Sequence, residues 1–190
     1  MKYVDRQLKG TYGYIRKQFR FELIETIILF AAAFGIFFIG YLTLHTKRSL
    51  WSVFAVLALL PASKSLVGVI MFARFRSLAE DVYDRYSRAV SGITTLYENI
   101  ITTRERSFYI PVICINGHNV FCYRPKDESS KDALKDHMDN VFKTAGYNVT
   151  FKIFDDEEAF LARAEQIRDK QTDEAVLSAK IADTIKAVSL

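Results

Sequence analysis

The residues best suited to chemistry are two cysteines and two histidines close together in the chain: Cys114, His118, Cys122 and His137. Two thiolates and two imidazoles can bind zinc tetrahedrally. The spacing is not that of a zinc finger, because there is no Cys-x2-Cys pair and His118 falls in a predicted turn. We therefore expect no metal and no other cofactor, with His137 lying on the apolar side of a helix.

The geometry of the two predicted strands also argues against pairing of the cysteines. The turn signal Asn116-Gly117 joins these strands into a hairpin. In an antiparallel hairpin with an even turn, facing residues have opposite sequence parity, so Cys114 and Cys122 point to opposite faces. A reactive thiol also needs a nearby base or helix N-terminus to lower its pKa. We expect both thiols to stay reduced and to pack as small apolar groups.

Acidic residues cluster at Asp127-Glu128 and over residues 155–158, where Asp155 and Glu158 have the spacing of a helix cap. Each cluster precedes or opens a predicted helix, where carboxylates accept hydrogen bonds from free backbone N–H groups. Capping is therefore expected, not metal binding. The sequence has no phosphate-binding glycine loop, zinc-protease motif or nucleophile-elbow motif, so we do not expect an enzyme.

The longest apolar runs all lie in the first 75 residues. No residue over 26–44 is charged, and the run over 50–73 is interrupted by Lys64 alone. Each run is about long enough for a helix to cross a bilayer, and the first has no polar face of the kind that a soluble helix shows. The sequence predicts a transmembrane hairpin over residues 23–75, with two spans at about 24–44 and 50–73.

Charge predicts the orientation of this hairpin. Residues 1–76 hold 11 Lys and Arg against three Asp and Glu, and residues 77–190 hold 15 against 19. A nucleic-acid-binding protein would carry its basic patch on the soluble part, whereas basic flanks of a hairpin suit anionic lipids. The positive-inside rule places both termini in the cytoplasm, in a multi-pass protein of the cell membrane. Residues 1–22, basic and aromatic, are expected to lie on the inner membrane surface.

Small residues indicate how the two spans meet. Ala31 and Gly35 are four residues apart in the first span, as are Ala58 and Ala62 in the second. This spacing lets helix backbones approach closely in lipid. We expect these four residues to form the helix contact.

Lys64 is the unusual residue of the hairpin, about ten residues and so about 15 Å from Arg74 along a helix. A charge there costs several kcal/mol unless it is paired, hydrated or able to reach water. One alternative is an intramembrane contact with a partner helix or a polar cavity. The other is that Pro61 kinks the helix and the lysine extends to the surface. The second is favoured, because Glu22 and Glu25 lie near the cytoplasmic end and leave no acid at the depth of Lys64.

Residues 76–169 predict a small cytoplasmic α+β domain with the order α-β-β-β-α-β-α. Ser77 and Glu80 have the spacing of a capping box at the first helix. Pro111 predicts that its strand is an edge strand or is irregular there. The predicted strands are 95–104, 107–115, 119–124 and 147–154. One later helix follows Ser129 and Ser130 and ends at about Ala145, and another begins at about residue 155. Residues 170–190 form an amphipathic helical tail that could dock on the domain, the membrane or another copy.

The αβββαβ part of this order resembles the core of the restriction-endonuclease-like fold. That resemblance implies a hydrolase with an acid near the end of the second strand and Glu-x-Lys on the third. The third strand here reads Val120-Phe121-Cys122-Tyr123-Arg124 and lacks this pattern. We therefore expect a non-enzymatic, membrane-anchored interaction or scaffold module. Its expected partners are the lipid bilayer and either another protein or a second copy, not nucleic acid. A degenerate or unusual hydrolase is the alternative.

Overall fold

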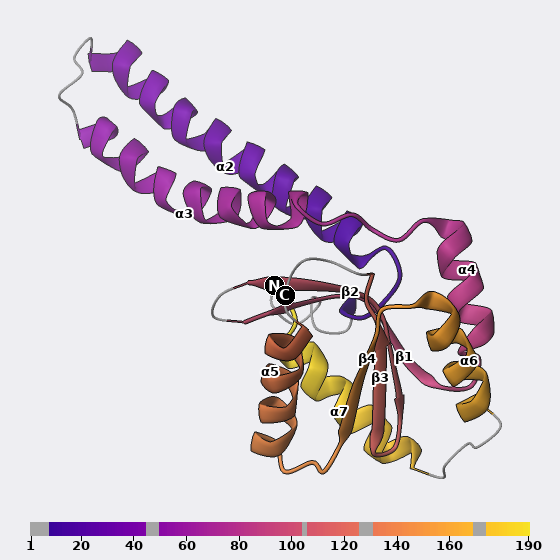
Figure 1. The fold of residues 1–190 in the computed structure, drawn as a ribbon. Helices are drawn as coiled ribbons and strands as arrows, with labels where there is room; N and C mark the ends of the chain where they lie inside the picture. Colours follow the sequence, from indigo (N-terminus) through magenta and orange to yellow (C-terminus); the bar gives the residue numbers. More distant parts are fainter. Residues whose placement is uncertain (1–7, 45–49, 104–105, 126–130, 169–173) are drawn as a thin grey trace. The chain divides into compact units, whose positions relative to one another are not determined.

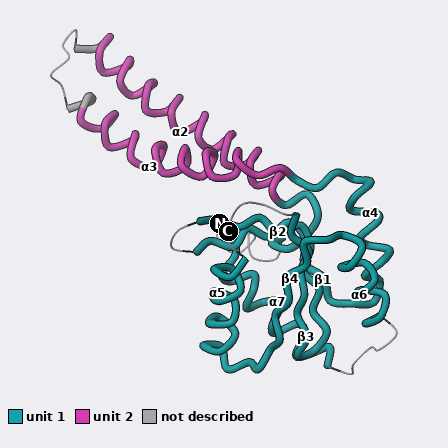
Figure 2. The backbone as a smooth tube through the Cα atoms, viewed as in Figure 1, with its two compact units in different colours: residues 1–14, 77–190 teal, residues 15–76 magenta. Residues whose placement is uncertain are grey.

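The computed structural model describes residues 8–44, 50–103, 106–125, 131–168 and 174–190 of the 190-residue chain (Figure 1). The chain forms two compact units (Figure 2). The hairpin unit is Ile15–Arg76, and the domain unit combines Met1–Tyr14 with Ser77–Leu190. Each unit has its own packing and is described by itself.

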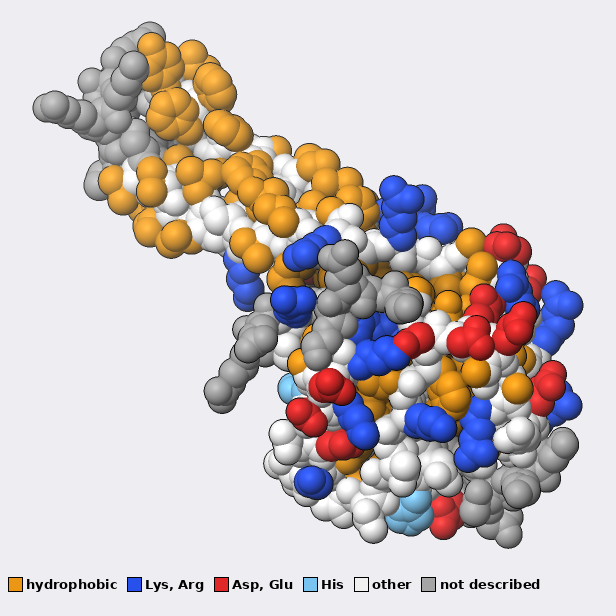
Figure 3. Space-filling model, viewed as in Figure 1, with side chains coloured by type: hydrophobic (Ala, Val, Ile, Leu, Met, Phe, Trp, Pro, Cys, Tyr) orange, Lys and Arg blue, Asp and Glu red, His pale blue; other side chains and the backbone are white. Residues whose placement is uncertain are grey.

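The hairpin unit consists of helices α2 (Tyr14–Leu44) and α3 (Leu50–Ala73). Both are long and apolar enough to cross a membrane, over Tyr14–Leu42 and Val53–Ala73. Only 17% of the most apolar window of each helix is buried, although helices that are apolar all round are normally covered by protein or by lipid. Figure 3 shows this apolar surface extending along the hairpin. The two predicted apolar helices are therefore present, and the first begins earlier than expected, at Tyr14.

The two helices pack along residues that recur at intervals of seven. Thr26, Ala33 and Gly40 are buried on α2, and Ala55 and Ala62 are buried on α3. A seven-residue step returns to nearly the same side of a helix, about 20° away, and so maintains a long contact. The small and hydroxyl side chains at these positions allow close approach of the backbones.

This packing differs from the expected contact at intervals of four. Ala62 is fully buried and Ala58 is half-buried. Ala31 is exposed, and a Cβ on the half-buried Gly35 would meet no atom of the described residues within 4 Å. Ala31 and Gly35 are each two residues from Ala33, and a two-residue step turns about 200° round the helix. They therefore lie on nearly the opposite side of α2 from the row of buried residues.

The domain unit is an α+β structure built on a four-stranded mixed sheet. Its strands lie in the order β1-β2-β3-β4; β1 with β2 and β2 with β3 are antiparallel, and β3 with β4 is parallel. The elements are α4 (Glu80–Ala89), β1 (Thr94–Thr102), β2 (Ser107–Asn116), β3 (Asn119–Tyr123), α5 (Lys131–Thr144), β4 (Thr150–Phe154), α6 (Glu157–Arg168) and α7 (Ala175–Val188). The predicted α+β class and the order of its elements are thus present.

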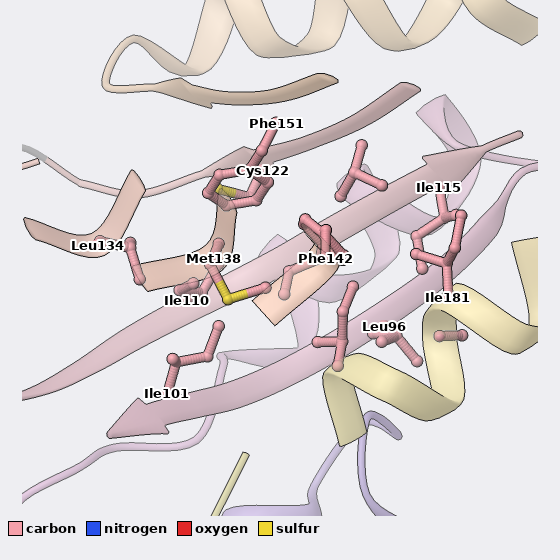
Figure 4. Close-up of a cluster of buried hydrophobic side chains, with 14 of the residues drawn as sticks. Leu96, Ile101, Ile110, Ile115, Cys122, Leu134, Met138, Phe142, Phe151 and Ile181 are labelled. Atoms are coloured by element: carbon pink, nitrogen blue, oxygen red, sulfur yellow. The ribbon is translucent and has the colours of Figure 1, made fainter. Parts of the chain in front are cut away.

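Helices cover both faces of this sheet. The larger apolar cluster joins the sheet to α5 and α7, and the smaller one joins it to α4 and α6. In Figure 4, Leu134, Met138 and Phe142 of α5 and Ile181 of α7 surround strand residues of the larger cluster. Because Ile181 and its neighbours are buried there, the C-terminal helix docks on the domain. It is part of the core, not a tail beyond residue 169.

The β1–β2 ladder is irregular at the pair formed by Glu98 and Pro111. The register skips this pair, and Ile110 and Ile113 face the same cluster although one is even-numbered and the other odd-numbered. Proline has no N–H to donate to a ladder, so Glu98 cannot receive the usual bond from it. The predicted irregularity at Pro111 is present. Its strand is an interior strand of the sheet, however, not an edge strand.

Candidate functional site on strand β1

Glu98 is the most unusual residue of the domain. It is 1% exposed and, with a φ of 52°, is the one non-glycine residue with positive φ in the part of the chain that the structure describes. This backbone conformation costs about 1–2 kcal/mol for a residue with a Cβ, and a buried carboxylate needs strong hydrogen-bond partners. Two such costs at one residue indicate a specific role.

The carboxylate of Glu98 holds the chain where it enters the domain from the hairpin. Glu98 Oε1 accepts hydrogen bonds from the Ser77 hydroxyl and from the backbone N–H of Leu78, the latter at 3.0 Å. The predicted capping box of Ser77 and Glu80 is therefore not formed. Helix α4 begins at Glu80, and Ala79 at its N-cap makes no side-chain hydrogen bond. The tertiary partner Glu98 binds Ser77 instead.

The segment that precedes the hairpin is attached to the same strand, one residue away. The Tyr97 N–H donates to the Gly10 carbonyl oxygen at 2.8 Å. Gly10 has a φ of 80°, and a Cβ there would lie 2.7 Å from Cδ2 of Leu96. Only glycine combines this conformation with so close an approach to the strand.

Aromatic stacking extends this attachment. The Tyr12 ring stacks on Tyr83 of α4 at 4.2 Å, and Tyr83 meets the edge of Tyr97 at 5.0 Å between ring centroids. Residues 8–14 are therefore part of the folded domain, whereas we expected residues 1–22 to lie on the membrane surface. Residues 15–22 belong to the hairpin unit, and residues 1–7 lie outside the described part of the chain.

The C-terminal residues occupy the next positions along β1. Ile101 bridges to Ser189, and the Leu190 N–H donates to the Ile100 carbonyl at 2.8 Å. Lys9 Nζ donates to the Ser189 carbonyl at 2.6 Å. We call this arrangement the β1 junction. It consists of residues 96–101 and the three segments bound to them, around residues 9–12, 77–78 and 189–190.

Asn99 and Tyr109 are the polar side chains near Glu98 whose surroundings indicate the chemical character of the β1 junction. Asn99 is 1% exposed, and its Nδ2 donates to the Tyr97 carbonyl at 3.3 Å, while its Oδ1 has no partner among the described residues. Burial raises the pKa of Tyr109, and the negative charge of Glu98 raises it further. The phenol therefore stays protonated at neutral pH. The hydrogen bonds of the junction fasten chain segments to β1.

The structure separates the four residues that could have bound zinc. Cys114 belongs to the cluster on the α4/α6 face and Cys122 to the cluster on the α5/α7 face, so the prediction of opposite faces is confirmed. Burial raises the pKa of both thiols. His118 is exposed in the turn and donates from Nδ1 to the Asn148 carbonyl at 2.7 Å, whereas His137 is half-buried on α5. The described residues contain no group of three or more potential metal ligands.

The acidic residues before α6 act in capping and ion pairing. Asp156 Oδ2 accepts from the Ala159 N–H at 3.2 Å, so the helix is capped one residue later than predicted. Asp155 pairs with Lys131, and Glu157 pairs with Arg85 at 2.9 Å. The other cluster, Asp127-Glu128, lies outside the described residues.

A hollow of about 560 Å³ lies between α4 and α6. Side chains of both charges line it, including Asp81, Arg88, Glu165 and Arg168.

Lys64 is exposed on α3 and makes no ion pair or hydrogen bond with the residues that the structure describes. Its neighbour Ser65 faces α2, where its hydroxyl accepts from Thr26 Oγ1 at 2.9 Å. The same hydroxyl lies 3.4 Å from Oε2 of Glu22, whose Oε1 accepts from Gln18 at 3.2 Å. The expectation that no acid of the first helix lies at the depth of Lys64 is therefore wrong, because α2 and α3 are aligned so that Glu22 is level with Ser65.

Comparison of the chain with protein-family models, with curated proteins and with solved structures gives no match. The function is therefore argued from the geometry of the two units.

Proposed function

We propose that this protein is a non-enzymatic interaction module anchored in a membrane by its hairpin unit. The observation that carries the proposal is the exposure of large apolar side chains along both helices, among them Ile28, Phe38, Leu60 and Ile70, each at least 57% exposed. Continuous apolar surface on this scale is costly in water. In a bilayer the same surface is solvated by lipid.

The composition of the domain unit supports the predicted topology. This unit contains both residues 8–14, before the hairpin, and the chain from Ser77 onward. Two segments of one folded domain lie on the same side of a membrane, so the hairpin between them crosses it twice. The basic flanks on that side favour the cytoplasm. Both termini are then cytoplasmic, in a multi-pass protein of the cell membrane.

An interaction role is supported by the free edge of the sheet. Thr150 N–H donates to the His118 carbonyl and Phe154 O accepts from Arg124 N–H, so alternate residues of β4 bond to β3. The backbone groups of residues 151 and 153 then point outward, and no described strand pairs with them. Such an edge can bind an extended segment of another protein or of a second copy. The exposed Lys152 limits unspecific pairing there.

The element order favours one other candidate, a degenerate hydrolase with restriction-endonuclease-like order. The described domain has α4-β1-β2-β3-α5-β4 in that order. Its buried acid Glu98, however, lies on the first strand and is bound by Ser77 and Leu78. We expect the purified protein to cleave neither DNA nor RNA with Mg²⁺ or Mn²⁺, and cleavage abolished by Glu98→Gln would favour the hydrolase.

Topology reporters and alkaline extraction test the membrane proposal. A reporter that works only in the cytoplasm should be active when fused before Met1 and after Leu190, and inactive when inserted between residues 46 and 47. The full chain should stay with membranes at alkaline pH. Activity of the C-terminal fusion on the outer side alone would reverse the orientation, and release by alkali would overturn the proposal.

A further inference from the structure

The hairpin unit carries a group of exposed cations at one end, which we call the cationic collar. Its members come from the first turns of α2 and from the residues that follow α3: Arg16, Lys17, Arg20, Arg74 and Arg76. The acids in the described part of the same unit are Glu22 and Glu25, and Glu22 is engaged by Gln18 and Ser65. The collar is therefore strongly positive.

The alignment of the two helices shows which cation of the collar lies nearest in depth to Lys64. Ser65 is bonded to Thr26 and lies within 3.4 Å of Glu22, and a Cβ on Gly68 would lie 2.7 Å from Glu22 Oε2. Residues 65–68 of α3 are therefore level with residues 22–26 of α2. Arg20 precedes this level by two to six residues, or about 3–9 Å along the helix.

The alignment of α2 with α3 determines which arginine lies nearest to Lys64 along the hairpin axis. Measured along α3, Lys64 is about 15 Å from Arg74. Measured across the hairpin, it is much closer to the level of Arg20. Lysine can bury its aliphatic stem and extend its ammonium group over such a distance. The backbone of Lys64 therefore lies near the middle of the Val53–Ala73 span, and its side chain extends toward the collar.

The exposed apolar surface reaches the collar on both helices. On α2 it begins with Phe21 and Ile24, directly after Arg20, and on α3 it continues past Lys64 to Val67 and Ile70, close to Arg74. Figure 3 shows the apolar surface of the hairpin giving way to Lys and Arg side chains at one end. The collar thus occupies the depth at which hydrocarbon gives way to headgroups.

We propose that the cationic collar binds the headgroups of anionic phospholipids. This inference rests on the proposed membrane anchoring and names the lipid class that the anchor prefers. Arginine donates in a fork that matches a phosphate, and each cation near an anionic surface contributes about fivefold in affinity. The collar is spread over two helices at the border of an apolar surface. That arrangement suits a headgroup held in place by its acyl chains, and not a free phosphate ion.

Lipid retention by the full-length protein tests this proposal. The chain is reconstituted in vesicles of phosphatidylcholine mixed with phosphatidylglycerol and extracted in neutral detergent, and retained lipids are identified by native mass spectrometry. The wild type should be enriched in phosphatidylglycerol. The triple variant Arg16→Gln, Lys17→Gln, Arg20→Gln should lose at least tenfold of that enrichment, since three cations of about fivefold each are removed.

A second variant and a matched control keep the result specific to the collar. Arg74→Gln with Arg76→Gln, at the end of the other helix, should lower the enrichment in the same direction. The control neutralises three exposed cations of the domain, Lys135, Lys143 and Arg163, and should retain the wild-type enrichment. An equal loss in the control would overturn the proposal, because net charge alone would then explain binding.

The remaining outcomes separate this proposal from the one on which it rests. A wild type that resists alkaline extraction but retains both lipids equally overturns the collar and leaves the membrane anchor standing. Release of the wild type by alkali overturns the anchor itself. Displacement of phosphatidylglycerol by inorganic phosphate would show a free-phosphate site and would also overturn the collar as a lipid site.

Discussion

The hairpin unit and the domain unit place their large apolar side chains in opposite ways. Among the described residues of the domain, only Leu8 and Val176 are large, apolar and exposed, whereas the hairpin exposes such residues along both helices. In the domain these side chains fill two clusters on the faces of a sheet. The hairpin keeps small and hydroxyl groups between its helices, as expected where lipid, not protein, covers the large side chains.

The largest expected effect compares two phenylalanines, one from each unit. Phe142 is 1% exposed in the core and Phe38 is 57% exposed on α2. Phe142→Ala should lower the free energy of unfolding of the domain by about 3–5 kcal/mol, whereas Phe38→Ala should leave it unchanged. Denaturant titration of the full chain in detergent, monitored by near-ultraviolet circular dichroism, measures both. A comparable loss for Phe38→Ala would remove the contrast between the units.

The next effect concerns the β1 junction. Glu98→Ala should lower the free energy of unfolding of the domain by about 3 kcal/mol, because Ser77 and Leu78 lose a charged acceptor. Glu98→Gly loses the same acceptor but relieves the positive φ, and should be more stable than Glu98→Ala by about 1 kcal/mol. The same titration compares the three proteins. Equal stability of the two variants would show that the backbone at Glu98 is not strained.

Two glycines that precede the hairpin test whether residues 8–14 pack on β1 of the domain. Gly10 and Gly13 both have positive φ, but a Cβ on Gly10 would lie 2.7 Å from Leu96 whereas one on Gly13 would meet nothing within 4 Å. Both alanine variants carry the conformational strain, and Gly10→Ala should cost about 1 kcal/mol more because it must displace Leu96. Thermal melts of the two variants measure the difference. Identical melting temperatures would argue that residues 8–14 do not pack on β1.

A smaller effect is expected at Lys64. If the side chain of Lys64 only extends toward the collar, Lys64→Leu should leave membrane insertion, stability and oligomeric state intact or improved. Crosslinking and thermal melts of the wild type and the variant, in detergent and in bilayers, provide the measurement. Loss of a defined oligomer or a marked fall in melting temperature would instead assign Lys64 to an intramembrane contact with a partner.

No effect is expected from mild oxidation or from chelators. Cys114 and Cys122 are fully buried on opposite faces of the sheet, so they should form no intramolecular disulfide and should react with thiol reagents only when the domain unfolds. Mass spectrometry after oxidation and the rate of thiol labelling measure this. Stoichiometric zinc in protein purified without a metal-affinity tag would contradict it.

The sequence by itself determined the features that depend on neighbouring residues. The absence of charge over residues 26–44 is a local property, and it is sufficient to define α2 as a long apolar helix. Alternation along the strands and the Asn116-Gly117 turn likewise fixed the faces of Cys114 and Cys122. The order of the domain elements followed from such local patterns.

Only the tertiary structure decided which surfaces cover these elements. Nothing in the local pattern of β1 distinguishes Glu98 from a solvent-exposed acid. Its partners Ser77 and Leu78 are about 20 residues away in the chain, and Pro111 signalled only that the neighbouring strand is irregular. The stripe on α7 likewise predicted an apolar face without specifying that the sheet buries it. The depth of Lys64 depends on how α2 aligns with α3, which Thr26, Glu22 and Ser65 set through contacts across the hairpin. Periodicity along one segment gives the direction of a side chain, whereas its partner is set by contacts between segments distant in sequence.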